Sequence, residues 1–167
     1  TTGTVLEERE VTVDEAQVRE VIGSFVGGYD QIPPMYSARK VNGKKLYELA
    51  RAGKEVERQA RHVDLPAIEI LEIRLPVVKF RVECSKGTYI RSLCADIGGK
   101  LGCGGTMQSL VRTRVGEFRL ADALTLAQLQ ELRDTDRLEE ALLPTDRIFA
   151  DFHAVHVEEK WRKLIDN

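Results

Sequence analysis

The sequence predicts an α+β domain with a mixed, largely antiparallel central sheet flanked by helices. Two observations carry this prediction. Residues 77–84 alternate apolar and charged side chains, which is typical of a strand with one buried face. Residues 13–25 and 90–101 repeat apolar side chains every three or four positions, which is typical of helices packed on a core. Strands and helices are interleaved unevenly, and this indicates the α+β or mixed class.

The first elements follow from local signals. Residues 3–12 are expected to form a strand, and the spacing of Thr12 and Glu15 predicts a capping box that opens the first helix. Gly27 and Gly28 are expected to end that helix. Its apolar stripe would be formed by Val18, Val21, Ile22 and Phe25.

Prolines and glycines set the next boundaries. Pro33-Pro34 predicts an extended loop over residues 29–38, and Asn42-Gly43 predicts a tight turn. A short helix is expected over residues 46–52, followed by strand-like residues 61–75 on both sides of Pro66.

The remaining elements are predicted in the same way. The helix at 90–101 would be followed by an extended stretch or strand pair over 107–118. The glycines of residues 98–105 indicate helix-end geometry, because no Lys-Ser/Thr pair follows them as in a phosphate loop. Thr125 and Gln128 repeat the capping-box spacing, so a helix is expected there, with another over 136–143.

Composition excludes several classes of protein. With 43% hydrophobic and 31% charged residues among 167, the chain is typical of a soluble globular protein. No apolar run approaches the roughly 20 residues of a membrane helix, and no signal-peptide pattern opens the sequence. Three cysteines without a C-x-x-C pair predict neither a disulfide framework nor a zinc site. They are expected to be reduced, mostly buried thiols of a cytoplasmic protein.

The charge is distributed unevenly along the chain. The net charge of −2 argues at first against a nucleic-acid partner. Residues 36–61, however, carry eight basic and three acidic side chains, and residues 85–119 carry six and two. A polyanion is attracted by a local patch, so the pattern keeps a nucleic-acid partner open. Ordinary solvated charge is the alternative.

Two long motifs stand out. The first is Gln-Ile-Pro-Pro-Met-Tyr-Ser-Ala-Arg-Lys at 31–40, which runs into Gly-Lys-Lys-Leu-Tyr-Glu-Leu-Ala-Arg-Ala-Gly at 43–53. The second is Cys-Ser-Lys-Gly-Thr-Tyr-Ile-Arg-Ser-Leu at 84–93, with Leu-Val-Arg-Thr at 110–113 further on. The chain resembles the TruB-type tRNA pseudouridine synthases in both motifs, over about residues 1–145.

That resemblance implies an activity and a set of residue roles. In the family, a uridine of the tRNA T-arm is flipped into a pocket and attacked by an aspartate. The glycosidic bond then breaks and the base rejoins through carbon, without cofactor or metal. Arg91 would pair with the aspartate and hold it ionised, and Tyr89 would lie beside the uracil and help remove a proton. Contact with the base or the RNA would fall to Leu110, Lys40 and Arg112. Tyr36 would either contact the RNA or support the proline-rich loop.

The residue types suit these roles on physical grounds. A carboxylate in a pocket that excludes water needs a fixed counter-charge, and the fork of Arg91 supplies one. A flipped base needs an aromatic or apolar wall to stack on, which suits Tyr89. Asp96 is rejected as the nucleophile, because its place in the motif lies on the helix after the site. It is expected to pair with a basic neighbour or to cap.

One part of the family pattern is missing from the sequence. The nucleophile lies in a Gly-x-Leu-Asp-Pro-like block, and no such block occurs in the 167 residues. Residues 1–145 are therefore predicted to be the C-terminal portion of a catalytic domain, inactive alone and with an incomplete sheet. Residues 146–167 would begin a truncated RNA-binding domain. The parent protein is expected to be a monomer with tRNA as its partner. The alternatives are a non-catalytic RNA-binding module that holds the T-arm and a structural protein without an RNA role.

Overall fold

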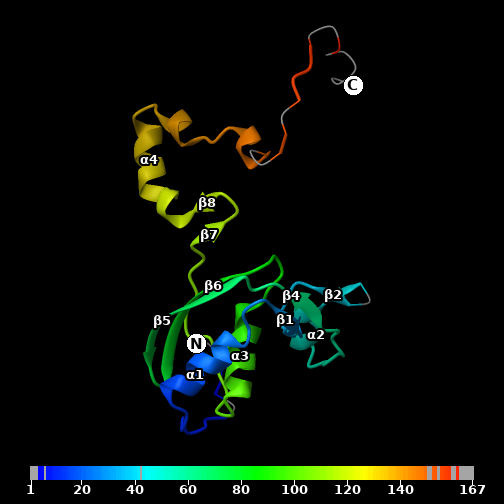
Figure 1. Ribbon diagram of the computed structural model, residues 1–167. Helices are drawn as coiled ribbons and strands as arrows, with labels where there is room; N and C mark the ends of the chain where they lie inside the picture. The colour runs from blue at the N-terminus through cyan, green and yellow to red at the C-terminus, as the bar shows by residue number, and fades with distance from the viewer. Residues whose placement is uncertain are drawn as a thin grey trace. The chain divides into compact units, whose positions relative to one another are not determined.

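The computed structural model describes residues 4–5, 7–41, 43–149, 152–153, 155–158 and 161. The chain forms two compact units, residues 1–110 and 111–167 (Figure 1). The predicted α+β class is confirmed, and all strand pairs in the described residues are antiparallel. Instead of one central sheet, the described strands form four separate two-stranded sheets, because no described strand pairs with strands of two sheets. The boundary between residues 145 and 146 stays a prediction.

The first helix, α1 (Glu15–Gly23), begins two residues later than predicted. Its cap is Asp14, whose carboxylate accepts from the Gln17 N–H at 2.8 Å, while the Gln17 side chain accepts from the Asp14 N–H at 2.9 Å. The Thr12–Glu15 assignment was therefore wrong, because the pair two positions on has the same spacing and forms the box. The strand expected over residues 3–12 was also wrong, since its described residues have no regular structure or strand partner.

The proline-rich segment lies between two short strand pairs. Strand β1 (Tyr29–Gln31) pairs with β4 (Arg61–Val63), so the extended loop predicted from residue 29 begins only after Gln31. Strands β2 (Lys40–Val41) and β3 (Lys44–Lys45) form a hairpin, which agrees with the predicted tight turn. Gly43 takes a positive φ of 79° there, and its neighbour Asn42 lies outside the described residues. The helix predicted next is confirmed as α2 (Leu46–Arg51).

The core of the first unit lies between a hairpin and two helices. Strands β5 (Ala67–Arg74) and β6 (Val77–Glu83) pair along their length with an irregularity between Ile70 and Glu72, and α3 spans Ile90–Lys100. Figure 1 shows α1 and α3 against this hairpin, where they contact it and each other. The buried cluster consists of Val18, Ile22, Phe25, Leu65, Leu93 and Ile97. The predicted strand at 77–84 and the helix at 90–101 are thus confirmed.

The three cysteines are free thiols, as expected, but they are less buried than predicted. Cys84 is exposed and follows Glu83, the last residue of β6. Cys94 and Cys103 are half-buried, and burial raises the pKa of the Cys94 thiol. Among the described residues, no helix combines the length and apolar character that crossing a bilayer requires.

The second unit consists of short elements. Strands β7 (Arg114–Val115) and β8 (Phe118–Arg119) form a hairpin, and α4 (Leu126–Asp134) begins at the predicted Thr125–Gln128 capping box. The helix expected over 136–143 is only a 3-10 turn over Leu138–Ala141. Two further 3-10 turns span Leu120–Asp122 and Thr145–Phe149. No described residue of this unit is buried.

Candidate functional site

The candidate site is built at the junction between β6 and α3. The turn after the strand is held by paired contacts: the Ser85 N–H donates to the Asp64 carbonyl, and the Asp64 N–H donates to Ser85 Oγ, both at 3.0 Å. Gly87 reverses the chain with a φ of 86°, which favours glycine. The next residues are Thr88 and Tyr89, and Tyr89 caps α3. The predicted site residues therefore follow a fixed turn at the start of a helix.

Tyr89 is held through its backbone by Gln31. The Tyr89 N–H donates to Gln31 Oε1 at 2.8 Å, and Gln31 Nε2 donates to the Tyr89 carbonyl at 3.1 Å. Gln31 is only 2% exposed, and the Tyr89 side chain is half-buried. Gln31 belongs to the first motif, but sequence reasoning gave it no role, because its partner lies 58 residues away.

Tyr29 and Asp96 extend this contact onto α3. Gln31 Nε2 also donates to the Tyr29 hydroxyl at 2.6 Å, and that hydroxyl donates to Asp96 Oδ2 at 2.7 Å. Burial raises the pKa of the Tyr29 hydroxyl above its usual range; the hydrogen bond from Gln31 offsets part of this, and Asp96 adds to it. The hydroxyl thus stays protonated and donates at neutral pH. The expectation that Asp96 pairs with a basic residue or caps a helix was wrong, because a tyrosine hydroxyl is its partner.

Arg91 joins the proline-rich motif to the same helix. It is exposed in the first turn of α3, and its Nη2 donates to the Tyr36 carbonyl at 2.8 Å. One residue on, Ser92 Oγ donates to the Ile32 carbonyl at 3.3 Å. The side chain of Tyr36 stays largely in solvent, since the residue is 59% exposed. Of the predicted site residues, the structure therefore brings together Tyr89, Arg91 and the backbone of Tyr36.

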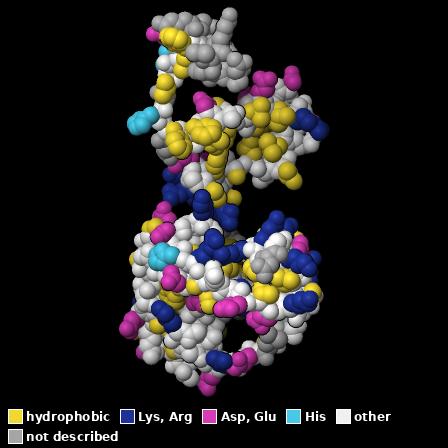
Figure 2. All heavy atoms as spheres, turned by 90° about the vertical axis from the view of Figure 1, so that its right-hand side faces the viewer, with side chains coloured by type: hydrophobic (Ala, Val, Ile, Leu, Met, Phe, Trp, Pro, Cys, Tyr) yellow, Lys and Arg dark blue, Asp and Glu magenta, His cyan; other side chains and the backbone are white. Residues whose placement is uncertain are grey.

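Lys40 lies elsewhere in the first unit, beside a basic hollow. This hollow of about 320 Å³ is lined by Pro33, Arg39, Lys40, Val41, Leu46, Glu57, Arg58 and Gln59. Arg58 is tied at its wall, because it donates to the Pro33 carbonyl at 3.3 Å and pairs with Glu55 at 3.2 Å. Figure 2 shows Lys and Arg side chains gathered over the face that carries β2, β3 and α2. The basic stretch predicted at 36–61 thus includes a surface with three cations around one hollow.

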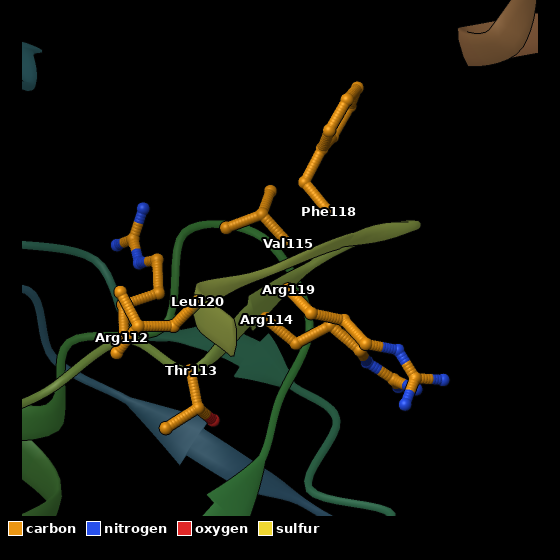
Figure 3. A pocket seen from close by; sticks show the side chains of 7 residues that line it. All are labelled: Arg112, Thr113, Arg114, Val115, Phe118, Arg119 and Leu120. Atoms are coloured by element: carbon orange, nitrogen blue, oxygen red, sulfur yellow. The ribbon is translucent and has the colours of Figure 1, made fainter. Parts of the chain in front are cut away.

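Leu110 and Arg112 lie on either side of the division between the two units. Leu110 is the last residue of the first unit and is 55% exposed, as suits a side chain available for contact. Arg112 lines a hollow of about 200 Å³ on the second unit, next to the β7–β8 hairpin. Figure 3 shows Arg114 and Arg119, which are opposite each other in the hairpin register, projecting side by side. Sequence reasoning did not single out this arginine pair, although two strands joined by Gly116 and Glu117 would have indicated it.

No three His, Cys, Asp or Glu side chains in the described ranges are grouped as metal ligands would be.

The fold and the junction between β6 and α3 together define the class of protein. It is an α+β domain in which a tyrosine and an arginine at the start of a helix meet a proline-rich loop, and this loop borders a basic surface. Residues 1–90 match the family described as "TruB family pseudouridylate synthase (N terminal domain)". Residues 91–150 match the "tRNA pseudouridylate synthase B C-terminal domain". The chain belongs to the TruB family.

Similar proteins agree with this assignment. The tRNA pseudouridine synthase B of Clostridium acetobutylicum is 48% identical over 165 residues, covering 99% of this chain and 56% of the relative. That of Alkaliphilus oremlandii is 49% identical over 165 residues, covering 99% and 54%. The chain thus spans about half the length of these curated relatives. A chain in the crystal structure of a Cbf5-Nop10-Gar1 complex is 31% identical with a TM-score of 0.64, covering 82% of this chain and 39% of that one.

Proposed function

We propose that this chain contributes the Tyr–Arg part of the active site of a tRNA pseudouridine synthase, which isomerises a T-arm uridine to pseudouridine. The observation that carries the proposal is the meeting of the two motifs at α3, where Arg91 donates to the Tyr36 carbonyl at 2.8 Å. Family membership and two relatives named tRNA pseudouridine synthase B support it. The proposed enzyme acts on tRNA as a cytoplasmic monomer, without cofactor or metal.

The position of Arg91 suits it to hold a carboxylate. It lies in the first turn of an 11-residue helix, where backbone N–H groups have no intrahelical acceptor and the helix dipole is positive. Its guanidinium has five N–H donors and uses one on Tyr36, so a fork remains for bidentate pairing. A nucleophilic aspartate beside this group would stay ionised and oriented. Tyr89, half-buried at the helix cap, would lie beside the flipped uracil and help remove a proton.

The remaining predicted residues are proposed to contact RNA. Lys40, beside Arg39 and Arg58, would neutralise backbone phosphates, and Arg112 would do so on the second unit. Leu110 would pack against the base, and the exposed ring of Tyr36 would contact the RNA. These residues fix the RNA in place, whereas the chemistry falls to Arg91 and Tyr89.

A chimera tests the proposal. In it, this chain replaces the matching 165 residues of the Clostridium acetobutylicum relative, whose remaining sequence is expected to supply the aspartate. A T-arm hairpin and a scrambled hairpin, both tritiated at uridine C5, report isomerisation by tritium release. Release from the T-arm hairpin alone is the expected result. Binding of the T-arm without release, while the unmodified relative reacts, would instead favour the second candidate, an RNA-binding module. That candidate is favoured by the three cations that line the basic hollow, Arg39, Lys40 and Arg58.

Replacing Lys40 with alanine is expected to weaken hairpin binding at every sequence tested. Each lost phosphate contact lowers the slope of log affinity against log salt by about 1. Titrations of the chimera at several salt concentrations measure this slope. Lys79→Ala is the matched control, because Lys79 is an exposed lysine on β6, outside the basic hollow. Equal slopes for the Lys40 variant and the unaltered chimera would remove Lys40 from the RNA-binding surface.

A further inference from the structure

Helix α3 begins differently from α1 and α4. In those two helices the third residue returns its side chain to the N–H of the cap, which forms a capping box. In α3 the cap is Tyr89, which has no side-chain oxygen in capping position. The third residue, Ser92, donates its hydroxyl to the Ile32 carbonyl instead. The N–H of Tyr89 therefore needs an acceptor from elsewhere in the chain.

Gln31 supplies that acceptor from a distant strand. Its side-chain amide pairs with both backbone groups of Tyr89, at 2.8 Å to the N–H and 3.1 Å to the carbonyl. In an antiparallel ladder the N–H and C=O of one residue bond the opposite residue in the same way, so the Gln31 amide takes the place of one residue of a paired strand. Because Gln31 is 2% exposed, water does not readily replace these bonds.

Tyr29 and Asp96 fix the direction of this amide. The second hydrogen of Gln31 Nε2 goes to the Tyr29 hydroxyl at 2.6 Å, and that hydroxyl donates to Asp96 at 2.7 Å. A reversed amide would set its NH₂ group against the Tyr89 N–H and lose all three contacts of Gln31. The Tyr29 ring is itself held edge-on by Phe25, with 4.9 Å between ring centroids. Each N–H or O–H donor in the network of Tyr29, Gln31, Tyr89 and Asp96 therefore has one acceptor.

We propose that Gln31, held by Tyr29 and Asp96, is a positioning residue that fixes Tyr89 and the first turn of α3 for the reaction. The proposal rests on the proposed function, because Tyr89 and Arg91 are the groups that it positions. Fixing the backbone on both sides of the Tyr89 Cα sets the direction of its side chain, and Arg91 follows two residues later in the same turn. Reactive groups displaced by about 1 Å lose on the order of 10²-fold in rate.

The test compares chemistry with binding in the chimera. Gln31→Met keeps a similar volume and removes all three hydrogen bonds. Its single-turnover rate at saturating enzyme is expected to fall roughly 10- to 100-fold, while the Kd for the T-arm hairpin changes less than about threefold. Ile22→Val is the stability control, since it removes one buried methylene group from the core and should leave the rate unchanged.

Two further variants keep the result decisive. Tyr29→Phe keeps the ring and removes only the hydroxyl, so it carries the test if Gln31→Met does not fold; its expected loss in single-turnover rate is about three- to tenfold. An unaltered rate in Gln31→Met overturns the role of Gln31. If Gln31→Met does not fold, an unaltered rate in Tyr29→Phe overturns it. Arg91→Ala reports separately on the proposed function. If it is inactive while the Gln31 and Tyr29 variants are not impaired, only this inference fails. If it is fully active, the role proposed for Arg91 fails, and if the unaltered chimera releases no tritium, the proposed function fails.

Discussion

Replacing Arg91 with alanine is expected to lower the single-turnover rate of the chimera by roughly 10³-fold, the effect of removing a group that stabilises charge at a reacting centre. Without the guanidinium, a pocket aspartate has no counter-charge, so it protonates or leaves its reactive position. Arg91→Lys keeps the charge but loses the planar fork, and an intermediate loss of about 10²-fold is expected. The measurement is pseudouridine formation in the T-arm hairpin at saturating enzyme, which separates chemistry from affinity.

The fold should tolerate the loss of Arg91. Its side chain is exposed and bonds one carbonyl, that of Tyr36, so the thermal unfolding of the variant should resemble that of the unaltered protein. Arg74→Ala is the control, since Arg74 is an exposed arginine on β5 that pairs with Glu72 at 2.6 Å, and the rate of this variant should not change. Turnover of Arg91→Ala at the unaltered rate would exclude Arg91 from the chemistry.

Among the substitutions proposed for this protein, replacing Gly98 with alanine is expected to lower the free energy of unfolding the most. A Cβ at this position would overlap backbone atoms of Gly104 and Gly105, which no side-chain rotation relieves. The contact is a close one, since the Gly104 N–H donates to the Gly98 carbonyl at 2.9 Å. Overpacking costs roughly 1–3 kcal/mol or more, and the upper end is expected here because backbone must move. Urea unfolding measures the change.

The neighbouring glycine provides the matched control. Gly99 lies in the same helix, and a Cβ there would have no atom within 4 Å. Gly99→Ala should therefore be neutral or stabilise the protein by up to about 1 kcal/mol, as in an open helix position. Equal unfolding midpoints for Gly98→Ala and Gly99→Ala would contradict the packing described for α3.

Local signals predicted the elements that depend only on neighbours in sequence. The capping pair Thr125–Gln128 and the alternation of residues 77–84 each specify an element without help from the rest of the chain. The cap of α1 was misplaced because Thr12–Glu15 and Asp14–Gln17 have equal spacing, and only the folded geometry selects between them. Residues 3–12 were expected to form a strand, but a strand needs a partner, and no described strand pairs with the described residues of this segment.

In the candidate site, too, local motifs were predictable from the sequence, whereas contacts between distant segments were not. The motifs were sufficient to predict Tyr89 and Arg91, whose roles stay predictions. The support from Gln31 requires two segments 58 residues apart to meet, and no local pattern encodes that meeting. The glycines of residues 98–105 were correctly placed at a helix end, with Gly102 and Gly104 at positive φ. Gly98 also allows the backbone of α3 to approach that of Gly104 and Gly105 closely, and this requirement depends on tertiary packing.

The bond between Arg91 and the Tyr36 carbonyl has a consequence for how affinity and turnover vary together. The Arg91 guanidinium, which is proposed to hold the nucleophile, also donates a hydrogen bond to the proline-rich loop. The exposed Tyr36 ring of that loop is proposed to contact RNA. A change that shifts this loop would therefore also displace the charge proposed to hold the nucleophile. In the proposed enzyme, a substitution that moves this loop is therefore expected to change RNA affinity and reaction rate together.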